Sequence, residues 1–186
     1  MPPKVKTTKE EIINAAINII RTCGEQALNA RNIALKLNCS TQPIFSNFAT
    51  MDALRIEVVK SATALYQEYI QREVERAEYP SYKASGMAYI RFAKEEKELF
   101  KFLYMRNRSA EVIPENDENF DKMIAIVSKN LGLNAQDAKI FHLETWAYVH
   151  GIATMFATEF LNLDWELVSK MLTDVYLGLK NQYITE

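Results

Sequence analysis

The sequence predicts an all-α protein of about nine helices. Apolar residues recur three and four positions apart along most of the chain, which is the spacing of an amphipathic helix. No segment alternates polar and apolar residues with the period of two that a half-buried strand requires. The 186 residues include only five glycines and five prolines, too few for the many tight turns of a β-rich protein.

Composition places the chain among soluble globular proteins, because 48% of its residues are hydrophobic and 25% are charged. No apolar run approaches the roughly 20 residues of a membrane span. The first residues, MPPKVKTTKEE, are basic but lack the apolar core of a secretory signal. Cys23 and Cys39 suggest neither a disulfide framework nor a metal site, so we expect a reduced, cytoplasmic setting.

Charge is distributed unevenly along the chain. The net charge is −2, but residues 1–60 hold eight lysines and arginines against five acidic residues. The N-terminal part therefore carries an excess of positive charge and the remainder an excess of negative charge. This pattern favours contact with nucleic acid at the N-terminal end only.

Local signals define the first two helices. Thr8 and Glu11 have the spacing of a capping box, and Gly24 follows the last apolar residue of that helix, where a glycine commonly ends it. Asn29 then stands before a second apolar segment as an N-cap. The sequence thus predicts a long amphipathic helix followed by a short one.

The segment 30–48 has the properties of a helix-turn-helix. Ala34 allows two helices to cross closely, and Asn38 adopts the left-handed conformation of a turn at low cost. Pro43 falls in the first turn of the next helix, and Ile44 faces back toward the first helix. The alternative is a helical hairpin buried in a larger bundle, against which the polar outer face of the second helix argues.

Further helices are expected on both sides of the breaks at Tyr79-Pro80-Ser81 and Gly132-Leu133-Asn134. Their expected ranges are 51–78, 82–94, 96–105, 117–131, 135–161 and 164–184. We expect a three-helix DNA-binding head over residues 1–50 and a helical ligand-binding and dimerisation domain over residues 51–186.

With these elements in place, the chain resembles the TetR family of transcriptional regulators. The residues that carry the resemblance are Thr8, Glu11, Ile12, Ile13, Ala15, Ala16, Gly24, Arg31, Asn32, Ile33, Ala34, Ser40, Ile44, Phe45, Phe48 and Leu54. In the C-terminal part, Trp146, His150 and Gly151 resemble the Trp-His-Gly signature of one TetR ligand-domain group.

The resemblance implies a dimeric DNA-binding regulator, a repressor that a small apolar or aromatic ligand releases from its DNA. Its partners would be a palindromic double-stranded operator, a small-molecule effector and a second copy of the chain, held through the last two helices at about 135–184. The alternative is a helical protein-interaction module without sequence-specific DNA binding. Phe45 and Met51 motivate it, since the family commonly has tyrosine and lysine there.

The candidate DNA-binding residues lie in the N-terminal arm and in the helix-turn-helix. They are Lys4, Lys6, Thr7, Arg31, Ser40, Thr41, Gln42, Pro43, Phe45, Ser46 and Asn47. Gln42 and Asn47 can bond adenine at two points, and the Thr41 methyl can pack on a thymine methyl. Pro43 and Phe45 offer apolar contact only.

The remaining candidates suit the DNA backbone. The hydroxyls of Ser40 and Ser46 and the guanidinium of Arg31 can each bond a phosphate oxygen. The resemblance implies that Lys4 and Lys6 follow the backbone as part of an arm. A solvated N-terminal tail without a DNA contact is the alternative.

Aromatic and methionine side chains are frequent between residues 60 and 160, where the resemblance implies a ligand site. The candidates for that site are Tyr66, Tyr89, Phe92, Trp146 and His150. The alternative for each is a place in the core, and for His150 a hydrogen bond to the backbone.

No motif for catalysis stands out in the sequence. His142 and His150 are the only histidines and lack the spacing of metal ligands. Neither a phosphate-binding glycine loop nor a nucleophile elbow is present. We expect no metal, no cofactor and no enzymatic activity.

Overall fold

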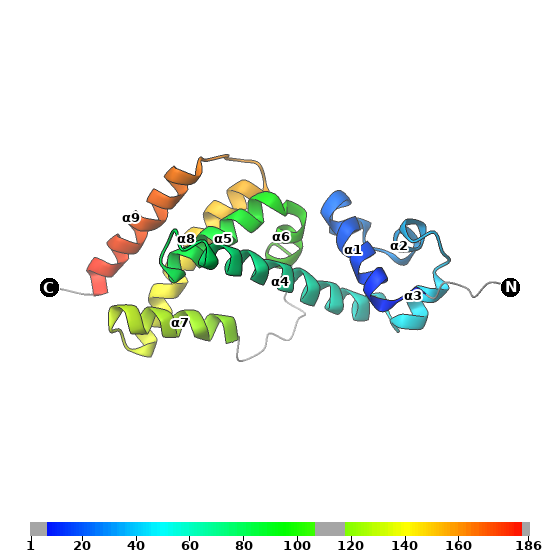
Figure 1. Ribbon diagram of the computed structural model, residues 1–186, viewed down its shortest axis with the longest axis horizontal. Coiled ribbons are helices and arrows are strands. Elements are labelled where there is room, and N and C mark those ends of the chain that lie inside the picture. The colour runs from blue at the N-terminus through cyan, green and yellow to red at the C-terminus, as the bar shows by residue number, and fades with distance from the viewer. Residues whose placement is uncertain (1–6, 107–117, 184–186) are drawn as a thin grey trace. The chain divides into compact units, whose positions relative to one another are not determined.

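A computed structural model describes residues 7–106 and 118–183, which contain nine α-helices, one short 3₁₀ helix and no strand (Figure 1). The all-α prediction is confirmed. The helices are α1 (Lys9–Cys23), α2 (Ala30–Lys36), α3 (Gln42–Asn47), α4 (Met51–Glu75), α5 (Ser81–Glu95), α6 (Lys97–Tyr104), α7 (Glu118–Leu131), α8 (Ala135–Ala157) and α9 (Trp165–Tyr183). The 3₁₀ helix, η1, spans Glu25–Ala27.

The described residues divide into two compact units. The first comprises the chain up to Gln67 together with Glu96–Arg106, so α6 belongs to it with α1, α2 and α3. The second comprises Glu68–Glu95 and the described residues that follow Arg106. Helix α4 contributes to both units. The sequence analysis divides the chain by function, into a DNA-binding head over residues 1–50 and a ligand-binding and dimerisation domain over residues 51–186. That functional division stays a prediction.

The first unit is built around the apolar face of α1. Ile12 and Ile20 are fully buried on this face, and α6 packs against α1. The Arg21 guanidinium donates two hydrogen bonds, of 2.6 and 2.8 Å, to the Glu96 carboxylate. At the start of α1 the capping box of Thr8 and Glu11 is present, as predicted.

The turn between α2 and α3 is closed by a Schellman motif. Asn38 has a φ of 50°, the left-handed conformation expected from the sequence. The Cys39 N–H donates to the Ala34 carbonyl over 2.9 Å, and the Asn38 N–H donates to the Leu35 carbonyl over 3.2 Å. This pair of bonds satisfies two of the free carbonyls at the end of α2. The turn then places Ile44, which is fully buried, on the inner side of α3.

Helices α5 and α8 form the centre of the second unit and run parallel. Tyr82 pairs with His142 and Tyr89 with His150, each through a 2.9 Å hydrogen bond between the hydroxyl and Nδ1. Gly86 lies between the two pairs, where a Cβ would stand 3.5 Å from Val149. Such a Cβ would make ordinary van der Waals contact there, so the site is closely packed but would accept an alanine.

Helix α8 ends earlier than the sequence predicts. The expected end at 161 is wrong, because the helix stops at Ala157 and Glu159 takes a φ of 58°. A second Schellman motif closes it: the Phe160 N–H donates to the Met155 carbonyl over 3.0 Å. No glycine or proline marks this end in the sequence.

Within residues 7–106 and 118–183, no helix combines the length and the apolar character needed to cross a membrane.

Substitutions at Asn38 test the turn. Asn38→Val should lower the free energy of unfolding by about 1–2 kcal/mol, because a β-branched residue is strained in the left-handed conformation. Asn38→Gly should stay within about 1 kcal/mol of the wild type, since glycine adopts that conformation freely. Urea unfolding followed by circular dichroism measures both. Glu159→Val and Glu159→Gly form the corresponding pair of variants at the end of α8. Equal stability of Asn38→Val and Asn38→Gly would contradict the left-handed conformation assigned to Asn38.

Candidate nucleic-acid interface and aromatic cluster

Helix α3 has one buried side and one bare side. Ile44 is fully buried and Phe48, which follows the helix, is 5% exposed. Thr41, Gln42 and Ser46 are exposed on the other side. Within the described residues, therefore, no other element covers the polar face of α3. This arrangement disfavours the alternative of a buried hairpin and leaves a surface able to enter a DNA groove.

Phe45 is 49% exposed and lies on the bare side of α3. A half-exposed aromatic ring is costly to leave in water and has no hydroxyl with which to bond a phosphate. Pro43 is half-buried in the first turn, as predicted. Both side chains present apolar surface of the kind that packs on a thymine methyl.

Ser46 is less suited to a phosphate contact than the sequence suggests. Its hydroxyl donates to the Gln42 carbonyl over 2.9 Å within α3. A phosphate oxygen needs a donor, so Ser46 would first have to release this intrahelical bond. Ser40 is exposed just before α3 and forms no such bond in the structure.

Asn47 is held by backbone carbonyls on two sides. Its Nδ2 group donates to the Pro43 carbonyl over 2.8 Å and to the Thr7 carbonyl over 3.3 Å. The amide nitrogen carries two hydrogens, and both are thus engaged. Reading an adenine requires an N–H and the Oδ1 of the same amide to face the base. Base reading by Asn47 stays a prediction, but this geometry does not favour it.

Arg31 is exposed at the start of α2 and forms no ion pair with any carboxylate of the described residues. The start of the helix is well fixed around it: Asn29 Oδ1 accepts the Asn32 N–H over 2.9 Å, and the Asn32 amide donates to the Ala27 carbonyl over 2.8 Å. Arg31 lines a shallow surface pocket of about 400 Å³ with these two asparagines. Its guanidinium is therefore available to an anionic partner such as a phosphate.

The N-terminal arm is only partly described. Thr7 is half-buried. Lys4 and Lys6, the expected phosphate partners, lie outside the described residues.

Three of the five ligand candidates lie together in the second unit. The His150 ring stacks on Trp146 with centroids 5.2 Å apart, and its Nδ1 is 2.9 Å from the Tyr89 hydroxyl. Nδ1 of His150 is thus bonded to a side chain, and a bond from this ring to the backbone stays a prediction. Burial lowers the pKa of His150 below its usual 6.5, so the ring is neutral at neutral pH. Trp146 is 42% exposed, whereas Tyr89 is buried.

The other two candidates each contact another aromatic ring. Phe92 is fully buried and packs edge-on against Tyr69, with centroids 5.4 Å apart, which is a core position. Tyr66 belongs to the first unit and contacts Tyr104 at 6.0 Å. A ligand-binding role for Phe92 and Tyr66 stays a prediction.

Sequence reasoning missed the second Tyr–His pair. The Tyr82 hydroxyl bonds His142, whose ring also lies 5.1 Å from that of Phe120. Burial lowers the pKa of His142 and raises that of Tyr82. The sequence held a signal for both Tyr–His pairs. Tyr82 and Tyr89 are seven residues apart, and His142 and His150 are eight apart. The two tyrosines therefore share one face of their helix, and the two histidines share one face of theirs.

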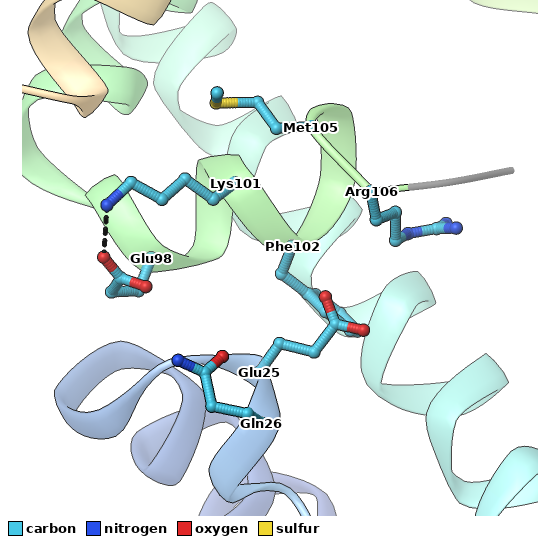
Figure 2. Close-up of a pocket in the computed structure, with 7 residues that line it drawn as sticks. All are labelled: Glu25, Gln26, Glu98, Lys101, Phe102, Met105 and Arg106. Carbon is cyan, nitrogen blue, oxygen red and sulfur yellow. Dashed lines mark hydrogen bonds and ion pairs between the residues drawn. The ribbon is translucent and has the colours of Figure 1, made fainter.

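A surface depression of about 440 Å³ lies in the first unit between η1 and α6, and Figure 2 shows the side chains around it. Its charged groups already have partners: the Lys101 ammonium is 2.6 Å from the Glu98 carboxylate, and Glu25 pairs with Arg55. None of the five ligand candidates lines this depression.

Within the described residues, no three side chains of the histidine, cysteine, aspartate and glutamate types gather as metal ligands would. The expectation that the protein needs no metal stays a prediction.

Comparisons with known proteins define the class. Residues 82–175 match the family model described as Tetracyclin repressor-like, C-terminal domain. The fold is similar to the crystal structure of a TetR-like transcriptional regulator from Rhodococcus sp. RHA1, with 13% identity over 95% of this chain and 96% of that one, and a TM-score of 0.69. It is also similar to a protein of unknown function from Rhodococcus sp. RHA1, with 20% identity over 98% of both chains and a TM-score of 0.73. No curated protein matches the sequence.

An N-terminal helix-turn-helix followed by a helical C-terminal region defines the class of DNA-binding transcriptional regulators. The chain belongs to the TetR family, because the family model covers half of its length. The Trp-His-Gly subgroup stays a prediction.

Stability should fall as the pH drops below about 6.5. Burial holds the pKa values of His142 and His150 below that value in the folded state. At lower pH the unfolded chain therefore binds protons that the folded chain does not, and unfolding is favoured. The stabilising contribution of the two histidines is complete above their pKa in the unfolded chain. It is lost as the pH falls toward their lower pKa in the folded protein.

Urea unfolding at a series of pH values from about 8 to about 5 measures this effect. The double variant His142→Gln/His150→Gln should show a smaller loss of stability over the same interval, since it has no histidine whose pKa differs between the folded and unfolded states. Equal pH dependence in the two proteins would exclude a role for the histidines.

Proposed function

We propose that this protein is a dimeric repressor that binds a palindromic operator and leaves it when a small apolar or aromatic ligand occupies the helical body. The proposal rests on one observation: the polar face of α3 is exposed, while Ile44 on its opposite side is buried. A helix in this position enters the major groove while the preceding helix crosses the backbone.

Direct reading is assigned to the exposed residues Thr41, the N-cap of α3, and Gln42, its first residue. The Gln42 amide can bond the N6 and N7 atoms of adenine together. Pro43 and Phe45 supply apolar contact beside them. Arg31, Ser40 and the arm lysines Lys4 and Lys6 bind phosphates, which positions α3 without reading sequence.

Dimerisation is assigned to α8 and α9. Large apolar side chains on these helices are between 37% and 48% exposed, namely Ile140, Leu143, Trp146, Met155, Leu167 and Leu177. Apolar surface on this scale marks an interaction site in a soluble protein. A two-fold dimer would place two copies of α3 in successive major grooves, which requires a separation of about 34–36 Å.

The ligand is assigned to the neighbourhood of Tyr89, Trp146 and His150. Stacked aromatic rings beside a hydroxyl suit a flat apolar ligand with one polar group. Helix α4 carries residues of both units, so it is the natural link between ligand and head. A ligand shifts the equilibrium only by its differential affinity for the two conformers. The proposal therefore requires a saturating ligand to lower operator affinity.

A helical protein-interaction module is the second candidate. The exposed Phe45, at 49%, and Leu35, at 73%, favour it, because apolar side chains on α2 and α3 suit a protein partner as well as DNA. A gel-shift titration against DNA flanking the protein's own gene separates the two. Absence of any salt-dependent, sequence-preferring binding would support the interaction module and reject the regulator.

Substitutions in the helix-turn-helix should separate base reading from backbone contact. Gln42→Ala should weaken operator binding by about 1–3 kcal/mol and relax the preference at one base pair. Arg31→Ala should weaken binding to all sequences alike and reduce the slope of log affinity against log salt by about one. Lys60→Ala, in the exposed part of α4, is the control. Equal effects of Gln42→Ala on operator and random DNA would reject its reading role.

Charge placed on α8 and α9 should dissociate the dimer. The double variant Leu143→Lys/Leu177→Lys buries two unpaired ammonium groups in the proposed interface, which is strongly unfavourable. Light scattering after size exclusion should give the mass of one chain, with an unchanged circular dichroism spectrum. Val74→Lys, at a 40% exposed position of α4, is the matched control. A double variant that remains dimeric would place the interface elsewhere.

A further inference from the structure

Lys83, on α5, is held by two hydroxyl groups of α9. Its Nζ donates a hydrogen bond of 2.7 Å to Ser169 Oγ and another of 2.7 Å to Thr173 Oγ1. Because the two hydroxyls are four positions apart, they lie on the same face of α9. The Thr173 hydroxyl gives its own hydrogen to the Ser169 carbonyl over 3.0 Å, which leaves its oxygen to accept from Lys83. The amine is thereby held between the two helices.

The surroundings of Lys83 differ from those of other lysines. Lys60, Lys101 and Lys170 each pair with a carboxylate, whereas in the part of the chain that the structure describes both hydrogen-bond acceptors of Lys83 are uncharged hydroxyls. The Tyr79 ring, with its centroid 4.7 Å from Nζ, attracts the ammonium less strongly than a carboxylate would. Burial lowers the pKa of Lys83 below its usual 10.5, so a larger share of this amine is unprotonated than in a lysine surrounded by water.

We propose that Lys83 is a modification site, at which Nζ receives an acyl group from a thioester. The side chain is half-buried, so the amine is held in place while part of the residue stays accessible. Once the ammonium has given one proton to water, the nitrogen lone pair attacks the thioester carbonyl carbon. The C–N bond forms, the C–S bond breaks, and the sulfur leaves as a thiol with the proton that the nitrogen loses. The acyl thioester is the co-reactant, and no oxidant or reductant is needed.

Acylation would weaken the attachment of α9 to α5. The nitrogen of the amide product carries one hydrogen and no charge, so it can donate to Ser169 or to Thr173 but not to both. Of the 19 residues of α9, only Val168 and Leu172 are buried, so the helix has few other anchors. Because α9 is assigned to dimerisation, any effect on the dimer rests on the proposed function, whereas the acylation and the loosening of α9 do not.

The test incubates the folded full-length protein with acetyl-coenzyme A and follows each lysine by peptide mass spectrometry. Lys83 should gain the acetyl group several-fold faster than Lys170, which is exposed on α9 and pairs with Asp174. The same reaction in urea is the control. In the unfolded chain the two lysines should react at similar rates, because the burial and the two hydroxyl contacts that distinguish Lys83 are gone.

Two substitutions separate the effect of acylation from loss of the lysine. Lys83→Arg keeps a cation with several N–H donors, whereas Lys83→Gln carries an uncharged amide, as the acylated side chain does. Hydrogen exchange of the α9 amides should be faster in Lys83→Gln and in the acetylated wild type than in Lys83→Arg, since exchange reports local opening. Lys170→Gln is the matched control on α9, and its exchange should stay close to that of the wild type. If Lys83→Gln does not fold, the acetylated wild type gives the same measurement.

Two results would overturn the proposal. Acetylation of Lys83 at or below the rate of Lys170 in the folded protein would show that the fold does not activate this amine. Unchanged exchange of α9 after acetylation would show that the modification does not loosen the helix. Light scattering separates these failures from that of the proposed function, because a wild type with the mass of one chain rejects the dimer without altering either readout.

Discussion

A helix of six residues forms too few backbone hydrogen bonds to persist alone in water, and α3 is such a helix. Its shape is imposed from one side, by burial of Ile44 and Phe48 and by the left-handed turn at Asn38. Because this packing uses a single stripe of the helix, the opposite stripe remains free. One-sided packing therefore makes α3 dependent on its neighbours and also leaves Thr41 and Gln42 exposed, and the proposed base reading follows from that exposure.

The second unit depends on polar contacts inside an aromatic environment. Two tyrosine hydroxyls pair with two neutral histidines across the parallel helices α5 and α8. A ligand that inserted its own polar group beside Tyr89 or His150 would have to replace one of these bonds.

Features set by neighbouring residues were predictable from the sequence. The capping box of Thr8, the turn at Asn38 and the proline at the start of α3 each depend on side chains within a few positions, and the structure has all three. Features set by distant residues were not. The partner of His150 is Tyr89, sixty-one positions away, and the amide of Asn47 meets Thr7. The spacing of the tyrosines and histidines shows which residues share a helix face, but not which face meets which, because the helices first have to pack before the groups meet.

The membership of α6 in the first unit has a consequence for synthesis of the protein. The face of α1 that α6 covers stays exposed until residues 96–106 have left the ribosome. Meanwhile the residues between Glu68 and Glu95, which belong to the other unit, have already emerged. Domains usually fold in order as the chain appears, but here neither unit is contiguous. The helix-turn-helix is translated before residues 68–95, yet the unit that contains it is complete only when residues 96–106 have followed.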